Sequence, residues 1–502
     1  MHRPPTAGAA ETATAAELAA VRPGLLPRFT AELPGARAAV LTRLWRALTH
    51  EPLPWLERRG PGTLRVRDGR VLSGPAPDPY ATDAYVTVVT LDGVSYDDPA
   101  RLMTALGVPH GSSLAVELDH SAVSLALSRA NQPPVQAAWP VSDWAWERRV
   151  VDGHPYHPNC RSRPGFSVAD QLAYAPEHAP EVRLGLMPVP AGDCLVSGDW
   201  PAELRDGERL LLPVHPWQAT HVLKQPGEPG PLARPLMSLR TLELLPGGLH
   251  VKTSLSARLT SSVRDISVGS IAASAVLSSF GEALAARTEG LLHVTRTLGA
   301  ATADSPDLAA MLRESPRAYA GPGEHVVPVA ALPTTELPRD PAWLAGFARL
   351  ALGVGLRLLE LGVALEAHGQ NLLVVLSADG LPLRLVYRDL ADIRVSPARL
   401  AAHGVPLPAG MPERILTDDV TALRRKLFGS LVAGALAGTA GSGRALGAAL
   451  AAAVPDLPRG PDLAALTDEP LPTKALTLMR LSPGTPGDQW TVLPNPLAHT
   501  PL

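Results

Sequence analysis

The segment KTSLSARLTSSVR occupies residues 252–264 and combines a lysine, arginines and several hydroxyl side chains. Its first residue lies near the end of a predicted strand, Leu249–Leu255, and its last hydroxyls are expected to begin a helix over Ser261–Arg287. Arg264 would then lie one turn inside that helix. Lys252, Arg264 and the positive end of the helix would gather hydrogen-bond donors around a phosphate group. The segment therefore predicts an anion site where a strand meets a helix.

A structural interpretation of the same segment competes with this one. Thr260 or Ser261 would merely cap the helix, and Arg264 would be solvated. The composition favours a functional Lys252, because only four of the 45 basic residues are lysine, at positions 224, 252, 426 and 474. Lysine is a compact point charge and arginine a planar fork, so a lysine retained in such a sequence suggests a place where a point charge is needed.

A predicted hairpin brings further donors to this segment. Its first strand, Leu239–Leu245, turns through Pro-Gly-Gly into the strand that carries Lys252. Ser238 and Arg240 are two positions apart, so on a strand they share one face. A turn centred near the second glycine places Lys252 beside Thr241, and a one-residue register shift brings the lysine to the same face.

The motif EAHGQN, residues 366–371, forms a second cluster just before a predicted strand, and YRD, residues 387–389, ends the next one. Asp379-Gly380 between them predicts a two-residue hairpin turn, which places Gln370 opposite Asp389 and Asn371 opposite Arg388. Carboxylate and amide oxygens that meet beside phosphates are typical of Mg²⁺ sites. The alternative is that His368 is a core or capping residue.

A third cluster, GHPYHPNCRSRPGF, occupies residues 153–166. Its prolines hold the backbone extended, so that His154, His157 and the arginines would address an anion. No zinc pattern or catalytic triad is evident around Cys160. His215-Pro216-Trp217-Gln218 is interpreted as a buried structural turn. A glycine-rich stretch at 441–447 lacks a preceding strand, and phosphate-loop and serine-hydrolase motifs are absent.

Length and charge limit the function classes. The 502 residues suggest two or three packed units, and a net charge of −3 gives no electrostatic footprint for nucleic acid or for an anionic membrane. The presence of only two cysteines favours a reducing cytoplasm. Neither a signal peptide nor a membrane segment is expected. The apolar tract 427–454 is interpreted as a buried helix pair. The segment Thr302–Pro341 is predicted to be a domain boundary. Further elements are expected as helices Glu11–Val21, Ala36–Glu51, Ser113–Ala130 and Ala342–Gly362, a hairpin Thr63–Leu72 and strands Tyr85–Leu91, Asn371–Leu376 and Leu383–Tyr387.

These motifs, in order, resemble the series of the NRPS-independent siderophore (NIS) synthetases of the IucA/IucC, or aerobactin-synthetase, family. The resemblance spans roughly residues 110–500, and the order of the motifs makes it specific. The motifs that carry it are GHPYHPNCRSRPGF (153–166), YAPE (174–177), LLPVHPWQ (211–218), SLRT (238–241), KTSLSARLTSSVR (252–264), EAHGQN (366–371), YRD (387–389) and KALTLMRL (474–481).

The resemblance implies an α+β fold shaped like a cupped hand, with antiparallel sheets, packed helices and commonly a homodimer. It divides the chain into a thumb-like domain 1–152, a fingers-like ATP-binding domain 153–335 and a palm-like domain 336–502. It assigns Lys252, Arg264 and His368 to catalysis, and Thr260, Arg264 and His368 to the substrate acid. Asn371 and Asp389 would hold Mg²⁺. The residues expected to contact ATP are His154, His157, Ser238, Arg240, Lys252, Thr260, Ser261, Arg264, Glu366 and Gln370.

The family reaction adenylates a carboxylate, usually of citrate or a citrate-derived half-acid, which an amine, hydroxylamine or alcohol then attacks to give an amide or ester. This chemistry needs no nucleophilic side chain, in keeping with the absence of one. Arg161 stands where the family usually has lysine. A kinase-like phosphotransferase and a non-catalytic acid-binding relative remain alternatives, and the acid, the nucleophile and the role of His368 as base or ligand stay open.

Overall fold

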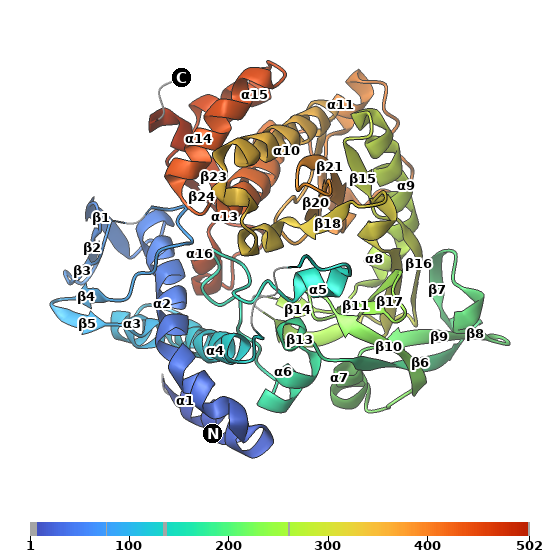
Figure 1. Cartoon of the computed structure of the whole chain (residues 1–502), viewed down its shortest axis with the longest axis horizontal. Coiled ribbons are helices and arrows are strands. Elements are labelled where there is room, and N and C mark those ends of the chain that lie inside the picture. The colour runs from blue at the N-terminus through green and yellow to red at the C-terminus, as the bar shows by residue number, and fades with distance from the viewer. Residues whose placement is uncertain (1–7, 77, 134–137, 260–261, 500–502) are drawn as a thin grey trace.

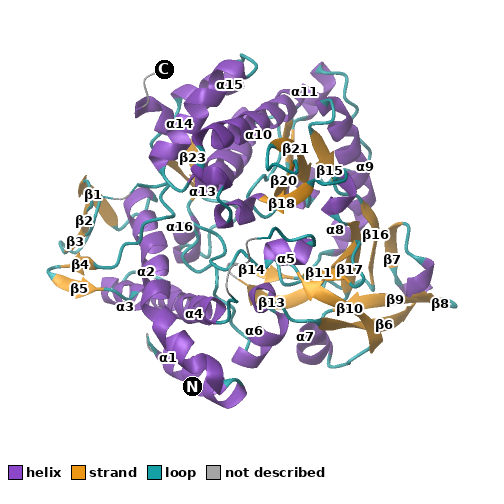
Figure 2. Cartoon of the chain, viewed as in Figure 1, coloured by secondary structure: helices purple, strands orange, loops and turns teal. Residues whose placement is uncertain are grey.

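The computed structural model describes residues 8–76, 78–133, 138–259 and 262–499. Helices and mostly antiparallel sheets alternate along the chain, which confirms the predicted α+β class (Figure 2). The described elements gather into an N-terminal group, a large central sheet and a helix-rich C-terminal group, with α5 and the loops that follow it lying between them (Figure 1).

The N-terminal group packs helices against one small sheet. The long helix α2 starts ten residues before the expected Ala36, because a proline and apolar residues continue its buried face. The Asp68-Gly69 hairpin is confirmed by the pairing of Thr63 with Ser73, whereas only residues 89–91 of the expected strand from Tyr85 pair with a neighbour. The elements are α1 Ala9–Val21, α2 Leu26–His50, β1 Leu56–Gly60, β2 Thr63–Val66, β3 Val71–Ser73, β4 Val89–Leu91, β5 Val94–Tyr96, α3 Pro99–Leu106 and α4 Gly111–Ala130.

The central part of the chain forms a nine-stranded sheet in the order β7-β16-β17-β12-β11-β10-β6-β9-β8. Its strands are β6 Val182–Pro190, β7 Leu195–Gly198, β8 Arg205–Asp206, β9 Arg209–Val214, β10 Glu228–Pro235, β11 Thr241–Leu244, β12 Leu249–Thr253, β16 Thr297–Thr302 and β17 Ala309–Glu314. The accompanying elements are α5 Asp143–Glu147, α6 Val168–Tyr174, α7 Pro216–Gln218, the hairpin of β13 Leu255–Leu259 and β14 Ser262–Arg264, α8 Val268–Ala272 and α9 Ser274–Ala285.

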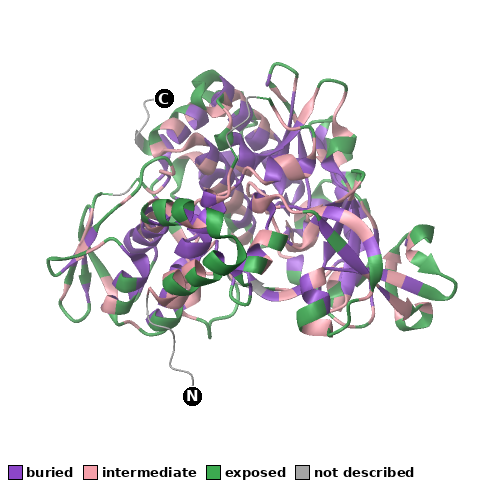
Figure 3. Cartoon of the chain, turned by 60° about the horizontal axis from the view of Figure 1, so that its bottom comes forward, coloured by how far each residue is buried: buried purple, intermediate pink, exposed green. Residues whose placement is uncertain are grey.

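The C-terminal group covers a four-stranded sheet, β15-β21-β20-β18, with helices. Helix α10, Pro341–Leu361, is long and apolar enough to span a membrane, but it packs on β21 and its buried side lies in the largest hydrophobic cluster. The buried interior of this region is visible in Figure 3. The remaining elements are β15 Leu292–Val294, β18 His325–Pro328, β19 Val363–Ala364, β20 Leu372–Leu376, β21 Pro382–Tyr387, β22 Arg394–Val395, α11 Pro397–Ala402, α12 Val420–Leu427, α13 Ala437–Ala440, α14 Gly443–Ala453, α15 Pro461–Asp468, β23 Leu471–Lys474, α16 Leu476–Leu481 and β24 Trp490–Leu493.

The segment Thr302–Pro341, predicted to be a domain boundary, contains strands of both sheets. Strand β17 pairs with β12 and β16 in the large sheet, and β18 pairs with β20 in the small one. The two sheets therefore share this part of the chain. The three-part division at residues 152 and 335 stays a prediction.

The expected helix from Ser261 is wrong, because Ser262–Arg264 form strand β14 paired with β13. Leu255, Ala257 and Leu259 are buried at every second position, which is the period of a strand. The helical part begins with α8, where the Ser267 hydroxyl accepts the backbone N–H of Ser270 as an N-cap.

Candidate active site

One large cavity collects the predicted functional residues. It has a volume of about 710 Å³, within the range of about 300–1,000 Å³ typical of small-molecule sites. Thr260 and Ser261 lie outside the described residues. The other predicted site residues all line the cavity: His154, His157, Ser238, Arg240, Lys252, Arg264, Glu366, His368, Gln370, Asn371 and Asp389.

A buried ion-pair cluster connects the two sheets in the cavity wall. Lys252 on β12 donates to Asp389 just after β21, with Nζ 2.6 Å from Oδ2. Arg313 on β17 approaches the other carboxylate oxygen at 3.3 Å. Burial lowers the pKa of Lys252 to about 7, against the opposing effect of Asp389. Lys252 and Arg313 hold the pKa of Asp389 well below its usual range despite burial of the carboxyl group.

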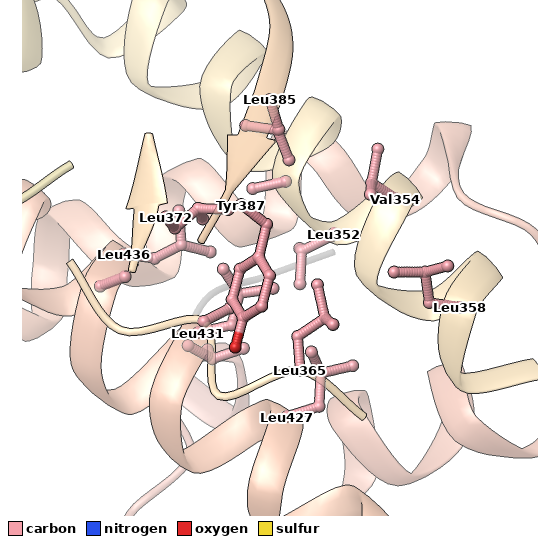
Figure 4. Packing of buried hydrophobic residues seen from close by; sticks show 14 of the residues in the cluster. Leu352, Val354, Leu358, Leu365, Leu372, Leu385, Tyr387, Leu427, Leu431 and Leu436 are labelled. Atoms are coloured by element: carbon pink, nitrogen blue, oxygen red, sulfur yellow. The ribbon is translucent and has the colours of Figure 1, made fainter. Parts of the chain in front are cut away.

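The backbone at Asp389 directs this carboxylate. Tyr387 is fully buried among leucines, including Leu352, Leu372 and Leu431, and so anchors the end of β21 (Figure 4). Two residues later Asp389 has φ +73°, a left-handed conformation that is uncommon for a residue other than glycine. Such strained positions persist where the surrounding structure fixes them, often at functional sites.

The Asp389 carboxylate is largely shielded from solvent, because its side chain is only 27% exposed and both oxygens contact cations. The two arginines near it in the sequence pair with other carboxylates. Arg388 pairs with Glu147 at 2.7 Å, and Arg394 pairs with Asp392 at 3.0 Å.

The predicted phosphate-binding residues Ser238 and Arg240 lie in a turn before β11 and not on a strand. The expectation that they share one face of a strand is therefore wrong. Leu239 between them has φ +64°, and the Ser238 hydroxyl bonds Thr241 in a turn. Arg240 donates to the carbonyl oxygens of Arg264 and Asp265, each at 2.6 Å. Burial lowers the pKa of Arg240 to about 10. The predicted neighbours Thr241 and Lys252 are confirmed as a register pair.

The open end of the second hairpin has the predicted register, but the ladder shifts by one residue between Val375 and Leu376, so the expected two-residue turn at Asp379-Gly380 is wrong. Leu372 pairs with Tyr387, and the N–H of Arg388 donates to the carbonyl of Asn371 at 3.0 Å. The Asn371 side-chain amide donates to the Glu366 carbonyl at 3.3 Å. The two halves of the EAHGQN motif are therefore held together beside Asp389.

Two histidines present the same donor to the cavity. The backbone N–H of Gln370 donates to His368 Nδ1, and that of Tyr156 donates to His154 Nδ1, both at 3.2 Å. A neutral imidazole whose Nδ1 accepts carries its proton on Nε2. Burial lowers the pKa of His368, so this neutral form is favoured at pH 7. Both side chains thus offer an Nε2–H donor.

Three of the four lysines form ion pairs with carboxylates that line the cavity. Lys426 and Lys474 both approach Glu366 Oε1, at 3.2 and 3.0 Å. Lys252 holds Asp389, and only Lys224 lies on an exposed turn. Lys474 belongs to the KALTLMRL motif, to which no role was assigned from the sequence. The rarity of lysine was the signal that could have found Lys426 and Lys474.

Sequence reasoning also missed Arg313 and Glu147. Glu147, at the end of α5, accepts Arg388 on one oxygen and the backbone N–H of Met237 on the other, both at 2.7 Å. Glu147 therefore connects the end of β21 in the four-stranded sheet to the turn that contains Met237 and Ser238. Arg161, where the resemblance implies lysine, lines the cavity, and its guanidinium donates to the carbonyls of Val150 and Val151.

A buried cluster of possible metal ligands lies beside this site. Asp143, Glu243 and His250 place ligand atoms within 4.8 Å of one another, the one such group among the described residues. Asp143 already bonds His250 at 2.8 Å and the Ser315 hydroxyl at 2.5 Å. These hydrogen bonds give the cluster a structural role, because they connect α5 to the large sheet and its following turn.

Comparison with known proteins agrees with this geometry. Residues 142–334 match the sequence model of the IucA/IucC family, and residues 341–485 match that of the ferric iron reductase FhuF-like transporter family. The first match confirms the predicted resemblance to the IucA/IucC family. The IucA/IucC match contains the large sheet with Lys252 and Arg264, and the FhuF-like match contains His368 and Asp389.

Solved structures of siderophore biosynthesis proteins share the fold along nearly the whole chain. Petrobactin biosynthesis protein AsbB from Bacillus anthracis is 18% identical, with a TM-score of 0.76 over 94% of this chain and 97% of that one. ATP-bound aerobactin synthetase IucA from Klebsiella pneumoniae is 19% identical, with a TM-score of 0.66 over 92% and 99%. The predicted NIS synthetase architecture is thereby confirmed.

Curated relatives match over shorter regions. A citryl-spermidine:spermidine ligase of Bacillus anthracis is 26% identical over 310 residues, 49% of this chain and 50% of the relative. Rhizobactin siderophore biosynthesis protein RhbC of Rhizobium meliloti is 31% identical over 159 residues, 25% and 27% of the two chains. The chain spans about half, or less, of the length of these curated relatives.

Proposed function

We propose that this protein is an ATP-dependent ligase of siderophore biosynthesis. It would adenylate citrate or a citrate-derived or other dicarboxylic half-acid and join it to an amine, hydroxylamine or alcohol. The observation that carries the proposal is the single cavity that brings the Lys252–Asp389–Arg313 cluster together with Arg264 and His368. The names of the relatives support it, since they include a ligase and a synthase named for citryl compounds and an ATP-bound synthetase.

In the first step a carboxylate oxygen of the acid attacks the α-phosphorus of ATP. The bond from that phosphorus to the bridging oxygen breaks, and pyrophosphate leaves. Lys252, Arg240 and Arg264 would neutralise the phosphate charge, since preorganised cations stabilise the charge that develops in phosphoryl transfer. His368 would donate its Nε2–H to the acid, which favours a binding role over that of a general base.

In the second step the nucleophile attacks the acyl carbon and AMP leaves, which gives the amide or ester. The other predicted ATP contacts, His154, His157, Ser238, Glu366 and Gln370, line the same cavity and would position the nucleotide. A homodimer and a cytoplasmic location remain part of the proposal.

The donor set around Asp389 fits magnesium only in part. Both Asp389 oxygens contact cations, and the Asn371 amide bonds a backbone carbonyl, so no oxygen cage is preformed among the described residues. Mg²⁺ commonly keeps several waters and phosphate oxygens and needs few protein ligands. Asp389 and Asn371 would hold an ion that arrives with ATP, and the ion would neutralise phosphate charge.

A pyrophosphate-release screen tests the proposal. Citrate, succinate and 2-oxoglutarate are crossed with hydroxylamine-bearing diamines and simple amines, and AMP, ADP and pyrophosphate are quantified. We expect acid-dependent pyrophosphate and AMP. ADP in their place would establish the phosphotransferase alternative, and no acid-dependent nucleotide cleavage with any pair would support a non-catalytic acid-binding protein.

The lowered pKa of Lys252 predicts proton uptake when a triphosphate binds. A base whose pKa in the protein is about 7 is largely neutral at pH 8, and phosphate charge raises its pKa again. Calorimetry of ATP binding at pH 8, in buffers of different ionisation enthalpy, should show uptake of up to about one proton. Lys252→Arg should abolish this uptake because arginine stays charged. Equal uptake in the variant would assign the proton to another group.

A further inference from the structure

A second, smaller cavity lies against the Lys252–Asp389 pair, away from the histidines. Its volume is about 110 Å³, the room of roughly three or four water molecules and too little for a nucleotide. Helices α8 and α9 form one wall, and β12, β16 and β17 contribute to the others. Lys252, Arg313 and Asp389 line both cavities, so the ion-pair cluster stands between them.

The charges around this second cavity favour an anion. Four cationic side chains line it, against the two carboxylates of Asp265 and Asp389. Asp389 is already paired with two of the cations, and Arg240 donates to backbone carbonyls, so positive charge remains in excess. A cationic ligand is disfavoured. The four cations are Arg240, Lys252, Arg313 and Arg414.

Two buried hydroxyls supply an independent reason to expect a ligand. Ser274 and Thr295 are 3% and 6% exposed, line the cavity, and have no side-chain hydrogen-bond partner among the described residues. The neighbouring Ser278 hydroxyl, by contrast, accepts the backbone N–H of Thr297 at 2.9 Å. Buried polar groups without partners destabilise a fold, and those at functional sites often bind something the protein alone does not contain.

We propose that this cavity is a diphosphate site, in which the Ser274 and Thr295 hydroxyls donate to phosphate oxygens and Arg240, Lys252 and Arg313 balance their charge. Resting on the proposed function, the diphosphate is either the terminal part of bound ATP or the pyrophosphate released when the bond from the α-phosphorus to the bridging oxygen breaks. Lys252, in the wall shared by both cavities, contacts phosphate before and after that cleavage.

The test compares ligand binding to the full chain and to a double variant, Ser274→Ala with Thr295→Val. Calorimetry with inorganic pyrophosphate should show affinity about tenfold or more weaker in the variant, since hydrogen bonds to charged groups are strong. AMP, which lacks a diphosphate, should bind equally to both proteins. The melting temperature should stay the same or rise, because the lost hydroxyls have no partners to leave behind.

Thr49→Val serves as the matched control. Thr49 is equally buried in α2 and bonds only carbonyls of its own helix, so this variant should leave pyrophosphate affinity unchanged. ATP distinguishes the two sources: weaker ATP binding in the double variant assigns the cavity to the terminal phosphates, and unchanged ATP binding assigns it to released pyrophosphate.

Unaltered pyrophosphate affinity in the double variant would overturn the inference and show that the cavity holds only water. Acid-dependent pyrophosphate release by the wild type would still support the proposed function in that case. Conversely, pyrophosphate binding that depends on these hydroxyls, without turnover of any acid, would retain the site and reject the ligase.

Discussion

Lys252→Ala and Arg264→Ala each lower acid-dependent pyrophosphate release by about 10² or more, as expected when one preorganised charge partner of a transferring phosphate is lost. Both cations line the cavity beside Asp389, and burial lowers the pKa of each. In the lysine variant Arg313 still contacts Asp389, and burial opposes the charged form of both Lys252 and Arg264, so both variants should remain folded. The measurement pairs steady-state rates with thermal melts.

Lys224→Ala provides the control for the lysine variant, because this exposed lysine lies outside the cavity. Its rate and melting temperature should match those of the wild type. If Lys252→Ala instead unfolded at much lower temperature but kept its specific activity, the lysine would be a structural partner of Asp389 and nothing more.

The sequence predicted the parts of the site that depend on local periodicity. Turn arithmetic placed Asn371 beside Arg388 and Thr241 beside Lys252, because hairpin register follows from the turn and from alternation of side chains. The same reasoning failed at Arg264. Its hydroxyl-rich neighbourhood was interpreted as a helix start, although the buried alternation from Leu255 to Leu259 already indicated a strand.

Contacts between distant segments were beyond such reasoning. Lys252 meets Asp389 across 137 positions, and Glu147 meets Arg388 across 241. Neither pairing has a local pattern, since each depends on how two sheets pack. The only sequence signal was compositional, in that three lysines retained among arginines all contact carboxylates at this site.

Replacing the Asp389 carboxylate should destabilise the fold as well as the site. Its carboxylate neutralises Lys252 and Arg313, so Asp389→Asn leaves two cations facing an uncharged amide. We expect a loss of about 1–3 kcal/mol in stability, less than for a fully buried pair because the side chain is 27% exposed. Since the protein lowers the pKa of this carboxyl, the contribution exists above pH 4 and disappears as the pH falls through the lowered pKa. The melting difference from the wild type should therefore shrink in acid.

The magnesium dependence separates a structural Asp389 from one that also holds the metal. If the ion that arrives with ATP displaces Lys252 or Arg313 from a carboxylate oxygen, Asp389→Asn should lower acid-dependent pyrophosphate release by about 10² or more. It should also raise the half-saturating magnesium concentration by about tenfold or more. Asp462→Asn is the control, because Asp462 joins Arg399 and Arg424 in an ion-pair cluster that does not line the cavity. This control should lower the melting temperature without moving the magnesium curve. If Asp389→Asn behaves in the same way, its carboxylate serves only to hold the two cations, and the metal is bound by phosphate oxygens and water.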